Sequence, residues 1–262
     1  MSLNSQLETV VSMAKQAGRL ILDVYESEEF DITLKSADSP LTRADTASHN
    51  LIIEKLKELS NFPVLSEESK AIPYKERAQW KIYWLVDPLD GTKEFIKRNG
   101  EFTVNIALIQ SGSPILGVIH APALDLTYCA LRGEGAFRQK AEEALTRIQV
   151  SRDARKLKIV ASRSHRGPEL ENFLARIRDY ECLNVGSSLK FCVVAEGAAD
   201  LYPRLGPTME WDTAAGQFIA EEAGAIVTDL QGQRLRYNKP SLLNPEFIVD
   251  GAFLHWQDWL GG

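Results

Sequence analysis

The sequence predicts a mixed α/β protein in which an antiparallel sheet is followed by a mainly parallel one. Three observations lead to this prediction. Apolar residues recur at helical spacing before residue 60, strand-like segments joined by short turns fill residues 102–131, and strands alternate with helices beyond residue 156. Because the order of elements changes near residue 153, we expect an amino-terminal lobe over residues 1–153 and a carboxy-terminal lobe over residues 154–262.

Two amphipathic helices are expected at the amino-terminal end. Apolar side chains recur every three or four residues from Leu7 to Val24, which predicts a first helix that ends near Glu26. A second helix follows Pro40 and carries its own apolar stripe. Asp45 lies near the start of this helix, where a carboxylate interacts favourably with the helix dipole, so capping alone could explain it.

The most informative run of the chain is Asp87-Pro88-Leu89-Asp90-Gly91-Thr92, which follows a short apolar segment at residues 82–86. That segment predicts a buried strand. Because Pro88 cannot donate a ladder hydrogen bond, we expect the strand to end just after Asp87. Gly91 and Thr92 then begin a short helix, whose free N–H groups can hold an anion.

The two aspartates of this run predict a bound cation. Two carboxylates repel each other by about 4 kcal/mol at roughly 4 Å and an effective dielectric constant near 20, and a cation between them removes that cost. The run contains neither histidine nor cysteine, and hard oxygen ligands favour magnesium or manganese over zinc. The alternative is a solvated turn, because aspartate, proline and glycine are frequent in turns.

The middle of the chain is typical of an antiparallel meander. The expected strands lie at residues 103–109, 115–120, 126–131 and 147–150, with a turn at residues 111–114. The linker at residues 153–156 then marks the boundary between the lobes.

Beyond this linker, strands alternate with helices, which favours parallel α/β winding. The expected strands lie at residues 159–161, 183–185, 199–202 and 225–228, and the expected helices at residues 169–177, 189–196 and 213–222. Ligands bind at the carboxyl ends of such strands, so the side chains that follow each strand are candidates for a site.

Composition excludes several classes of protein. The chain has 262 residues and a formal net charge of −6, with 44% hydrophobic and 25% charged residues, as an ordinary globular protein has. The acidic balance argues against a nucleic acid polymer as partner. Three cysteines without a CxxC pairing favour reduced thiols, and no apolar run is long enough to cross a membrane. We therefore expect a cytoplasmic protein without a transmembrane segment.

Acidic residues in two other segments are candidate partners of the aspartate run. Glu67 and Glu68 follow a short apolar strand, and one could bind a metal while the other orients a water, although adjacent acids are commonly just solvated. Asp212 begins a helix rich in small residues. Capping alone would explain Asp212, but packing of Trp211 beside it could fix the carboxylate for a catalytic role.

Cationic and hydroxyl side chains follow two of the carboxy-terminal strands. Ser187, Ser188 and Lys190 open a helix, which suits a second phosphate cradle, whereas a serine cap beside a surface lysine is the simpler explanation. Arg163 and His165 follow the strand at residues 159–161 and could add a cation and an imidazole at the same edge of the sheet.

Several common catalytic motifs are absent from the sequence. It contains no GxxxxGK[ST] phosphate loop, no HExxH, no GxSxG and no GxGxxG after a strand. Asp87 and Asp90 are separated by three positions rather than two, which argues against an aspartyl nucleophile and favours water as the nucleophile.

Three of these segments together resemble the signature of a known family. Ser66-Glu67-Glu68, the run from Asp87 to Thr92, and Trp211-Asp212-Thr213-Ala214-Ala215-Gly216 are similar, in order and separation, to the motifs of the magnesium-dependent, lithium-sensitive phosphomonoesterases related to inositol monophosphatase. The resemblance covers essentially the whole chain and implies a layered αβαβα sandwich, which agrees with the order of elements above. Residues 83–108 and 186–191 most resemble the bisphosphate nucleotidase branch of that family.

The resemblance implies two or three magnesium ions, with manganese as a substitute. Glu67, Asp87 and the Leu89 carbonyl would hold one ion, and Asp87, Asp90 and Asp212 would hold another, so Asp87 would bridge them. Glu67, Asp90, Asp212 and the Leu89 backbone would also border the substrate.

The resemblance further implies a set of catalytic residues. Thr92 and Asp45 would assist the attacking water, directly or through a further metal, which favours a catalytic role for Asp45 over capping. Glu67 joins them as a catalytic residue, and Glu68 supports it. The Gly91 and Thr92 amides would bind the phosphoryl oxygens.

A small phosphorylated molecule is the implied substrate. A bisphosphorylated nucleotide needs cations beyond the metals, which Lys190 with Ser187, Ser188, Arg163 and His165 could supply, and an inositol phosphate does not need them. We therefore expect hydrolysis of adenosine 3',5'-bisphosphate to AMP and phosphate, which clears a by-product of sulfate assimilation. An inositol or sugar monophosphatase and a non-catalytic nucleotide-binding module are the alternatives. The sequence leaves open the oligomeric state and peripheral attachment to the cytoplasmic face of the inner membrane.

Overall fold

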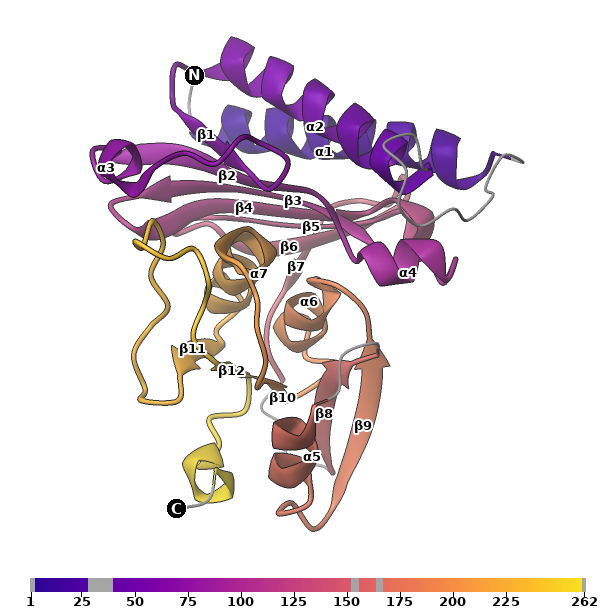
Figure 1. Ribbon diagram of the computed structural model, residues 1–262. Coiled ribbons are helices and arrows are strands. Elements are labelled where there is room, and N and C mark those ends of the chain that lie inside the picture. Colours follow the sequence, from indigo (N-terminus) through magenta and orange to yellow (C-terminus); the bar gives the residue numbers. More distant parts are fainter. Residues whose placement is uncertain (1–2, 28–39, 152–155, 164–166, 261–262) are drawn as a thin grey trace.

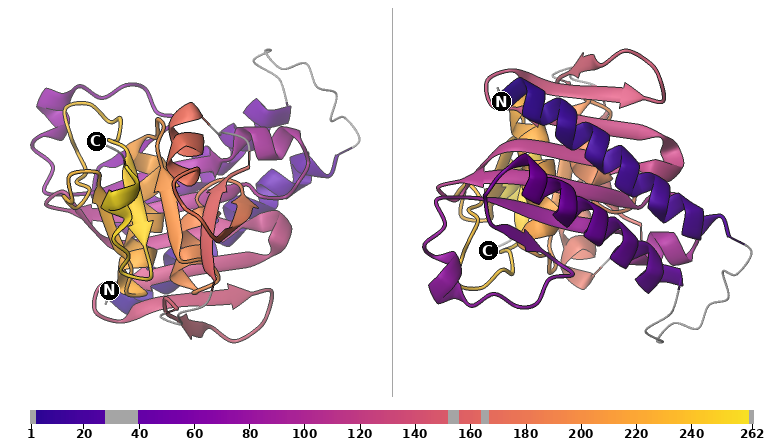
Figure 2. Two further views of the ribbon diagram at one scale, coloured as in Figure 1. Left: turned by 90° about the horizontal axis from the view of Figure 1, so that it is seen from below. Right: turned by 90° about the horizontal axis from the view of Figure 1, so that it is seen from above.

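Layers of helix and sheet alternate in the computed structural model (Figure 1). It describes residues 3–27, 40–151, 156–163 and 167–260. Helices α1 (Leu3–Tyr25) and α2 (Pro40–Leu59) lie side by side across the outer face of a seven-stranded sheet, as the view from above shows (Figure 2). Helices α6 (Leu189–Ala195) and α7 (Glu210–Glu222) fill the space between that sheet and a five-stranded sheet, and α5 (Pro168–Leu174) covers the far face of the second sheet. The expected αβαβα layering is confirmed.

The seven-stranded sheet follows chain order from edge to edge. Its strands are β1 (Val64–Ser66), β2 (Ile82–Asp90), β3 (Thr103–Gln110), β4 (Ser113–Ala121), β5 (Leu126–Leu131), β6 (Gly135–Lys140) and β7 (Thr146–Ile148). Only β1 and β2 pair in parallel, and every later neighbour is antiparallel, as the meander predicted. The expected turn at residues 111–114 is shorter in the structure, because β4 already begins at Ser113.

The expectation that β2 ends just after Asp87 is wrong. The strand continues to Asp90, and its register against β3 shifts between these two aspartates. Pro88 therefore lies in a bulge, where a missing ladder donor costs little. The bulge leads directly into α4 (Thr92–Ile96), so both aspartates lie at the carboxyl end of the strand.

The five-stranded sheet is mixed. Its strands are β8 (Leu157–Ser162), β9 (Tyr180–Val185), β10 (Leu201–Arg204), β11 (Ile226–Asp229) and β12 (Phe247–Asp250), in the order β11-β12-β10-β8-β9. Strands β9, β8 and β10 pair in parallel, and β12 pairs antiparallel with both β10 and β11. The four strands that the sequence predicts run in one direction, and the antiparallel strand β12 is the one it missed.

Helix α7 joins the two halves of the molecule. It lies in the carboxy-terminal half of the chain, yet it packs on β2 to β6 of the seven-stranded sheet. The two sheets fall on either side of residue 153, and the expected linker at residues 153–156 lies mostly outside the described residues. We therefore propose the lobes 1–153 and 154–262 as a division by sheet, with one shared core between them.

The remaining elements are short. They are the helix α3 (Tyr74–Arg77) and the 3-10 helices η1 (Pro122–Leu124) and η2 (Trp256–Trp259). Cys129, Cys182 and Cys192 are outside disulfide bonds, as expected. Among the helices that the structure describes, none combines the length and the apolar character that crossing a membrane requires.

Candidate active site

Three carboxylates from distant parts of the chain meet at one edge of the seven-stranded sheet. Ser66 of β1 is in register with Val86 of the parallel strand β2, so Glu67, the residue after β1, lies beside Asp87 within β2. Asp212 approaches from the first turn of α7. One ligand atom from each of Glu67, Asp87 and Asp212 lies within 4.8 Å of the others, a grouping that could hold a metal ion.

Burial and mutual repulsion raise the pKa of these carboxyls. The pKa of Asp87 lies well above its ordinary value, and burial followed by the charge of Asp90 raises the pKa of Glu67 and of Asp212 to about 7. Glu67 is the most exposed of the three side chains, and Asp87 is buried. A divalent cation among these carboxylates would attract each of them and so offset their mutual repulsion. Their oxygen ligands fit magnesium or manganese.

Asp90 lies beside this cluster, and its carboxylate also contacts the start of α6. Its Oδ2 accepts a hydrogen bond of 2.6 Å from the Ser188 backbone N–H, and burial is the main cause of its raised pKa, with Lys190 acting in the opposite direction. The Ser188 hydroxyl donates to Asn105 at 2.8 Å. The serine-cap explanation is therefore wrong, because no side-chain cap bond is formed at this helix start.

Asp45 also reaches the acidic cluster. Helix α2 begins at Pro40, which puts Asp45 beyond the first turn and makes the capping explanation wrong. Burial, with the charges of Glu68 and Glu67, raises its pKa to about 8, and its buried Oδ1 has no hydrogen-bond partner among the described residues. Such an orphaned oxygen is expected where a water or an ion belongs.

The backbone after Asp87 is tied down from two sides. The Leu89 N–H donates to Asp87 Oδ1 at 3.1 Å, and the Ser48 hydroxyl of α2 donates to the Pro88 carbonyl at 2.7 Å. Gly91 then adopts a left-handed conformation with φ of 93°, which favours glycine, and Thr92 begins α4 as an exposed residue. The predicted run therefore forms a rigid bend that leads from a strand into a helix.

His49 is a neighbour of the cluster that sequence reasoning missed. Its Nδ1 lies 2.9 Å from the Ser66 hydroxyl, next to Glu67. It follows Asp45 by one helical turn on the same face of α2, and this spacing is the signal that could have found it.

A cavity of about 240 Å³ adjoins Asp90 and Asp212. Lys190 lines it and is only 4% exposed, so the surface-lysine explanation is wrong. Its ammonium group donates to the Ser187 carbonyl and lies 5.5 Å from the centre of the Tyr202 ring. Burial lowers the pKa of Lys190 to about 8, against the effect of Asp90.

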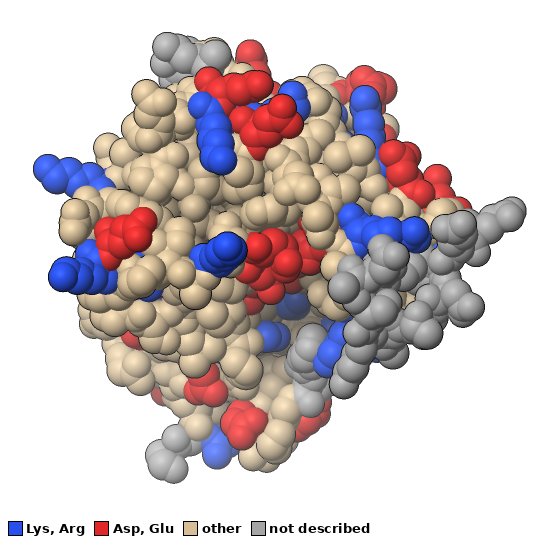
Figure 3. Space-filling model, turned by 45° about the horizontal axis from the view of Figure 1, so that its top comes forward, with Lys and Arg blue, Asp and Glu red and all other residues tan. Residues whose placement is uncertain are grey.

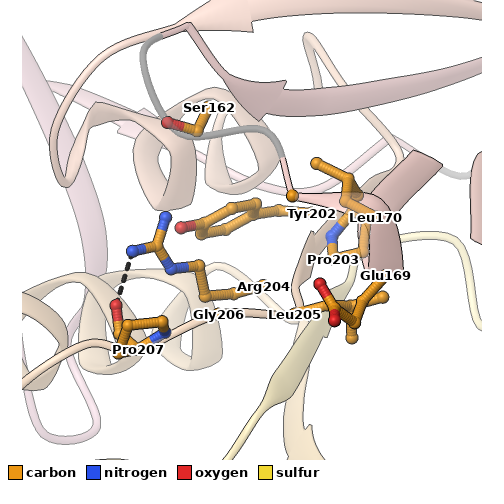
Figure 4. Close-up of a pocket in the computed structure, with 10 residues that line it drawn as sticks. Ser162, Glu169, Leu170, Tyr202, Pro203, Arg204, Leu205, Gly206 and Pro207 are labelled. Atoms are coloured by element: carbon orange, nitrogen blue, oxygen red, sulfur yellow. Dashed lines mark hydrogen bonds between the residues drawn. The ribbon is translucent and has the colours of Figure 1, made fainter.

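Arg204 is the second cation of this cavity, and sequence reasoning missed it. Its guanidinium group donates to the Pro207 carbonyl at 2.6 Å and lies beside Tyr202 (Figure 4). A second cavity of about 490 Å³ continues past the same residues toward Ser162 and Leu170. The signal was its position, because Arg204 ends β10, at the carboxyl edge of the sheet.

The sequence of residues 3–255 matches the family described as the inositol monophosphatase family. The chain belongs to the inositol monophosphatase family. Members of this family are metal-dependent, which agrees with the grouping of Glu67, Asp87 and Asp212.

Several members of the family with curated names are similar over nearly the whole chain. The chain is 51% identical to the 3'(2'),5'-bisphosphate nucleotidase CysQ of Salmonella typhimurium over 93% of this chain and 98% of that protein. It is 50% identical to CysQ of Escherichia coli with the same coverage. The crystal structure of CysQ from Bacteroides thetaiotaomicron superimposes with a TM-score of 0.88 at 44% identity, over 95% of this chain and 98% of that one.

Several described residues that the sequence assigned to the substrate do not line the two cavities described above, namely Glu67, Leu89, Gly91, Thr92 and Arg163. Arg163 forms a bidentate ion pair with the Glu101 carboxylate, with N···O distances of 2.7 and 2.8 Å. The Glu101 carboxylate also accepts a hydrogen bond from the Gly186 N–H at 2.8 Å. The arginine thus anchors the segment before α6, and its contact with substrate stays a prediction. His165 lies outside the described residues.

The surface carries the same contrast of charges. Acidic side chains gather near the middle of one face, and basic side chains lie at the edge of the hollow beside them (Figure 3). A polar opening with both signs of charge suits a ligand that carries phosphate and binds together with metal ions.

Proposed function

We propose that this protein is a magnesium-dependent 3'(2'),5'-bisphosphate nucleotidase that hydrolyses adenosine 3',5'-bisphosphate to AMP and phosphate. The observation that carries the proposal is the junction of the acidic cluster with a cavity lined by Lys190 and Arg204. Relatives about half identical to this chain bear the name of this activity, which supports the assignment.

The family resemblance assigns the metal ligands, and the grouping of Glu67, Asp87 and Asp212 supports the assignment. Glu67, Asp87 and the Leu89 carbonyl would hold one magnesium ion, and Asp87, Asp90 and Asp212 would hold a second, with manganese as a substitute. Bound there, the ions would make a water more acidic and neutralise charge on the phosphoryl group. Asp87 is suited to a shared position because it is buried and one of its oxygens lies within 4.8 Å of ligand atoms of both Glu67 and Asp212.

The other residues orient the reactants. The N–H groups of Gly91 and Thr92 at the start of α4 would donate to the phosphoryl oxygens, where negative charge grows during transfer. Asp45 would accept a hydrogen bond from the attacking water, because its Oδ1 is buried and unpaired among the described residues. The Thr92 hydroxyl would hold the same water from the opposite element.

The second phosphate group explains the cations. Lys190 and Arg204 line the cavity beyond Asp90 and would bind the phosphate that is not hydrolysed. Ser187 and Ser188 border the same cavity. The larger cavity of about 490 Å³ behind Arg204 offers room for the nucleoside, since ligand pockets commonly enclose several hundred cubic ångströms.

A phosphate-release assay with magnesium tests the proposal. It compares adenosine 3',5'-bisphosphate, inositol 1-phosphate and fructose 1,6-bisphosphate, each with and without lithium. The proposal predicts that kcat/KM is highest for the adenosine bisphosphate and that lithium lowers it. Equal kcat/KM for inositol 1-phosphate would favour a general monophosphatase, and binding of the nucleotide without phosphate release would favour a non-catalytic module.

A further inference from the structure

A buried polar network holds the first turn of α7, the turn that carries Asp212. Asn244 lies at its centre and is 6% exposed. Its amide nitrogen donates to the Met209 carbonyl at 2.7 Å and to the Thr213 hydroxyl at 2.9 Å, and its backbone N–H donates to the Thr208 carbonyl at 2.8 Å. These contacts bracket Asp212 on both sides.

An ion pair continues this network. Glu210 is fully buried, and its carboxylate accepts from the Lys239 ammonium at 2.7 Å and from the backbone N–H groups of Asn238 and Lys239 at 2.7 and 3.0 Å. The Lys239 ammonium also donates to Asn244 Oδ1 at 3.1 Å. Two residues of one loop are thereby joined to the residue that begins α7.

The network acts on Asp212 through Met209. Met209 is the residue before α7 and has no side-chain oxygen with which to cap the helix. Instead, its backbone N–H donates to Asp212 Oδ2 at 2.8 Å, so the position of Met209 sets the direction of the Asp212 carboxylate. Asn244 in turn holds the Met209 carbonyl, so it helps to fix the Asp212 carboxylate, one oxygen of which lies within 4.8 Å of ligand atoms of Glu67 and Asp87.

We infer that Asn244 and the Glu210–Lys239 ion pair are positioning residues that orient Asp212 for metal binding. This inference rests on the proposed metal site. A buried ion pair contributes little net stability compared with apolar residues of the same size, so a geometric role accounts better for burying Glu210 completely. Groups that orient a metal ligand typically change metal affinity about 10- to 100-fold when they are removed.

Calorimetric titration with Mn²⁺ alone, without substrate, tests the inference. Asn244→Ala is expected to weaken Mn²⁺ binding about tenfold, and kcat is expected to recover when Mn²⁺ is saturating. Asn238→Gly is the matched control. The Asn238 side chain donates to and accepts from Arg77 rather than α7, at 2.6 and 2.8 Å, so its loss should lower the melting temperature without changing Mn²⁺ affinity.

Two further variants keep the result unambiguous. Lys239→Met removes the ammonium group that links Glu210 to Asn244, and it changes a partly exposed position. It should also weaken Mn²⁺ binding, so it can replace Asn244→Ala as the test if that variant does not fold. Unchanged Mn²⁺ affinity in a folded Asn244→Ala or Lys239→Met protein, or an equal loss in Asn238→Gly, would overturn the inference. Asp212→Asn separates the two proposals, because unchanged affinity in that variant would refute the metal site itself.

Discussion

Asp87 is the residue on which the proposed chemistry depends most. It is 1% exposed, lies within reach of both Glu67 and Asp212, and would serve both metal ions. Burial of an unpaired carboxylate destabilises a folded protein, and a bound metal ion would offset this effect at Asp87.

Replacement of this residue should separate activity from stability. Asp87→Asn keeps the oxygen that accepts from the Leu89 N–H but removes the charge, so kcat should fall at least about a hundredfold. The metal-free variant should melt at a higher temperature than the metal-free parent, because repulsion is relieved. Assays and thermal melts check both effects, with Asp179→Asn as the control, because Asp179 is an exposed carboxylate in a surface ion pair with Lys156. Retained activity in Asp87→Asn would contradict the assignment.

The raised pKa values of Glu67 and Asp212 predict how the stability of the protein depends on pH. In the folded protein the pKa of Glu67 and of Asp212 rises from 4.5 and 3.8 to about 7. The unfolded chain therefore releases these protons first, and the metal-free fold loses stability as pH rises through this interval, fully so above about pH 7. The gain in melting temperature from a fixed magnesium concentration should be larger at about pH 8 than at about pH 6. A gain that is equal or smaller at the higher pH would contradict this account.

Arg204 allows a test of how the second phosphate group is bound. A hydrogen bond to a charged group contributes about 1.5–3 kcal/mol, so Arg204→Gln should raise KM for adenosine 3',5'-bisphosphate about tenfold or more. KM for adenosine 3'-monophosphate should change little, because that substrate lacks the second phosphate group. Steady-state kinetics with both substrates measure the difference, and an equal rise for both would show that the arginine acts in another way.

At the scale of elements, the strands with a single strong pattern were predictable. The expected strand at residues 126–131 matches β5, and the expected helices at residues 189–196 and 213–222 follow α6 and α7 closely, because apolar periodicity determined them. Strands β6 and β12 were missed. Strand β6 has mixed polarity, and β12 is a short apolar segment. Neither therefore shows the alternation of apolar and polar residues that predicts a strand.

The bulge in β2 shows why bounds near a site are hard to predict. A proline normally ends a strand, yet the shift in register lets β2 continue to Asp90. Tertiary contacts hold this irregular backbone, among them the bond from Ser48 to the Pro88 carbonyl. Such a contact joins residues far apart in the chain, and local sequence patterns do not reveal it.

The packing of α6 against α7 gives a prediction for elements. A side-chain carbon added at Gly216 of α7 would lie 2.5 Å from Phe191 of α6, whose ring is buried. Gly216→Val should therefore destabilise the protein by about 1–3 kcal/mol in urea unfolding. The same change at Gly206, where nothing lies within 4 Å of the added atom, is the control. Equal stability of both variants would show that α6 and α7 separate easily.

At the scale of the whole molecule, the layers bring together what the sequence keeps apart. Glu67 and Asp87 come from the seven-stranded sheet, and Asp212 comes from α7, which packs between the sheets. The family resemblance predicted this meeting, whereas composition and spacing alone predicted each acidic segment separately. The position of Arg204 at the end of β10 marked it only as a candidate, because the cavity that it lines is formed by several segments distant in the sequence.

The central claim is that acidic oxygens from distant segments jointly hold divalent metal ions. Anomalous diffraction from crystals of the protein grown with Mn²⁺ tests it most directly. The account predicts anomalous peaks bounded by the carboxylates of Glu67, Asp87 and Asp212. An ordered, active protein whose Mn²⁺ peaks all lie away from these carboxylates would contradict it.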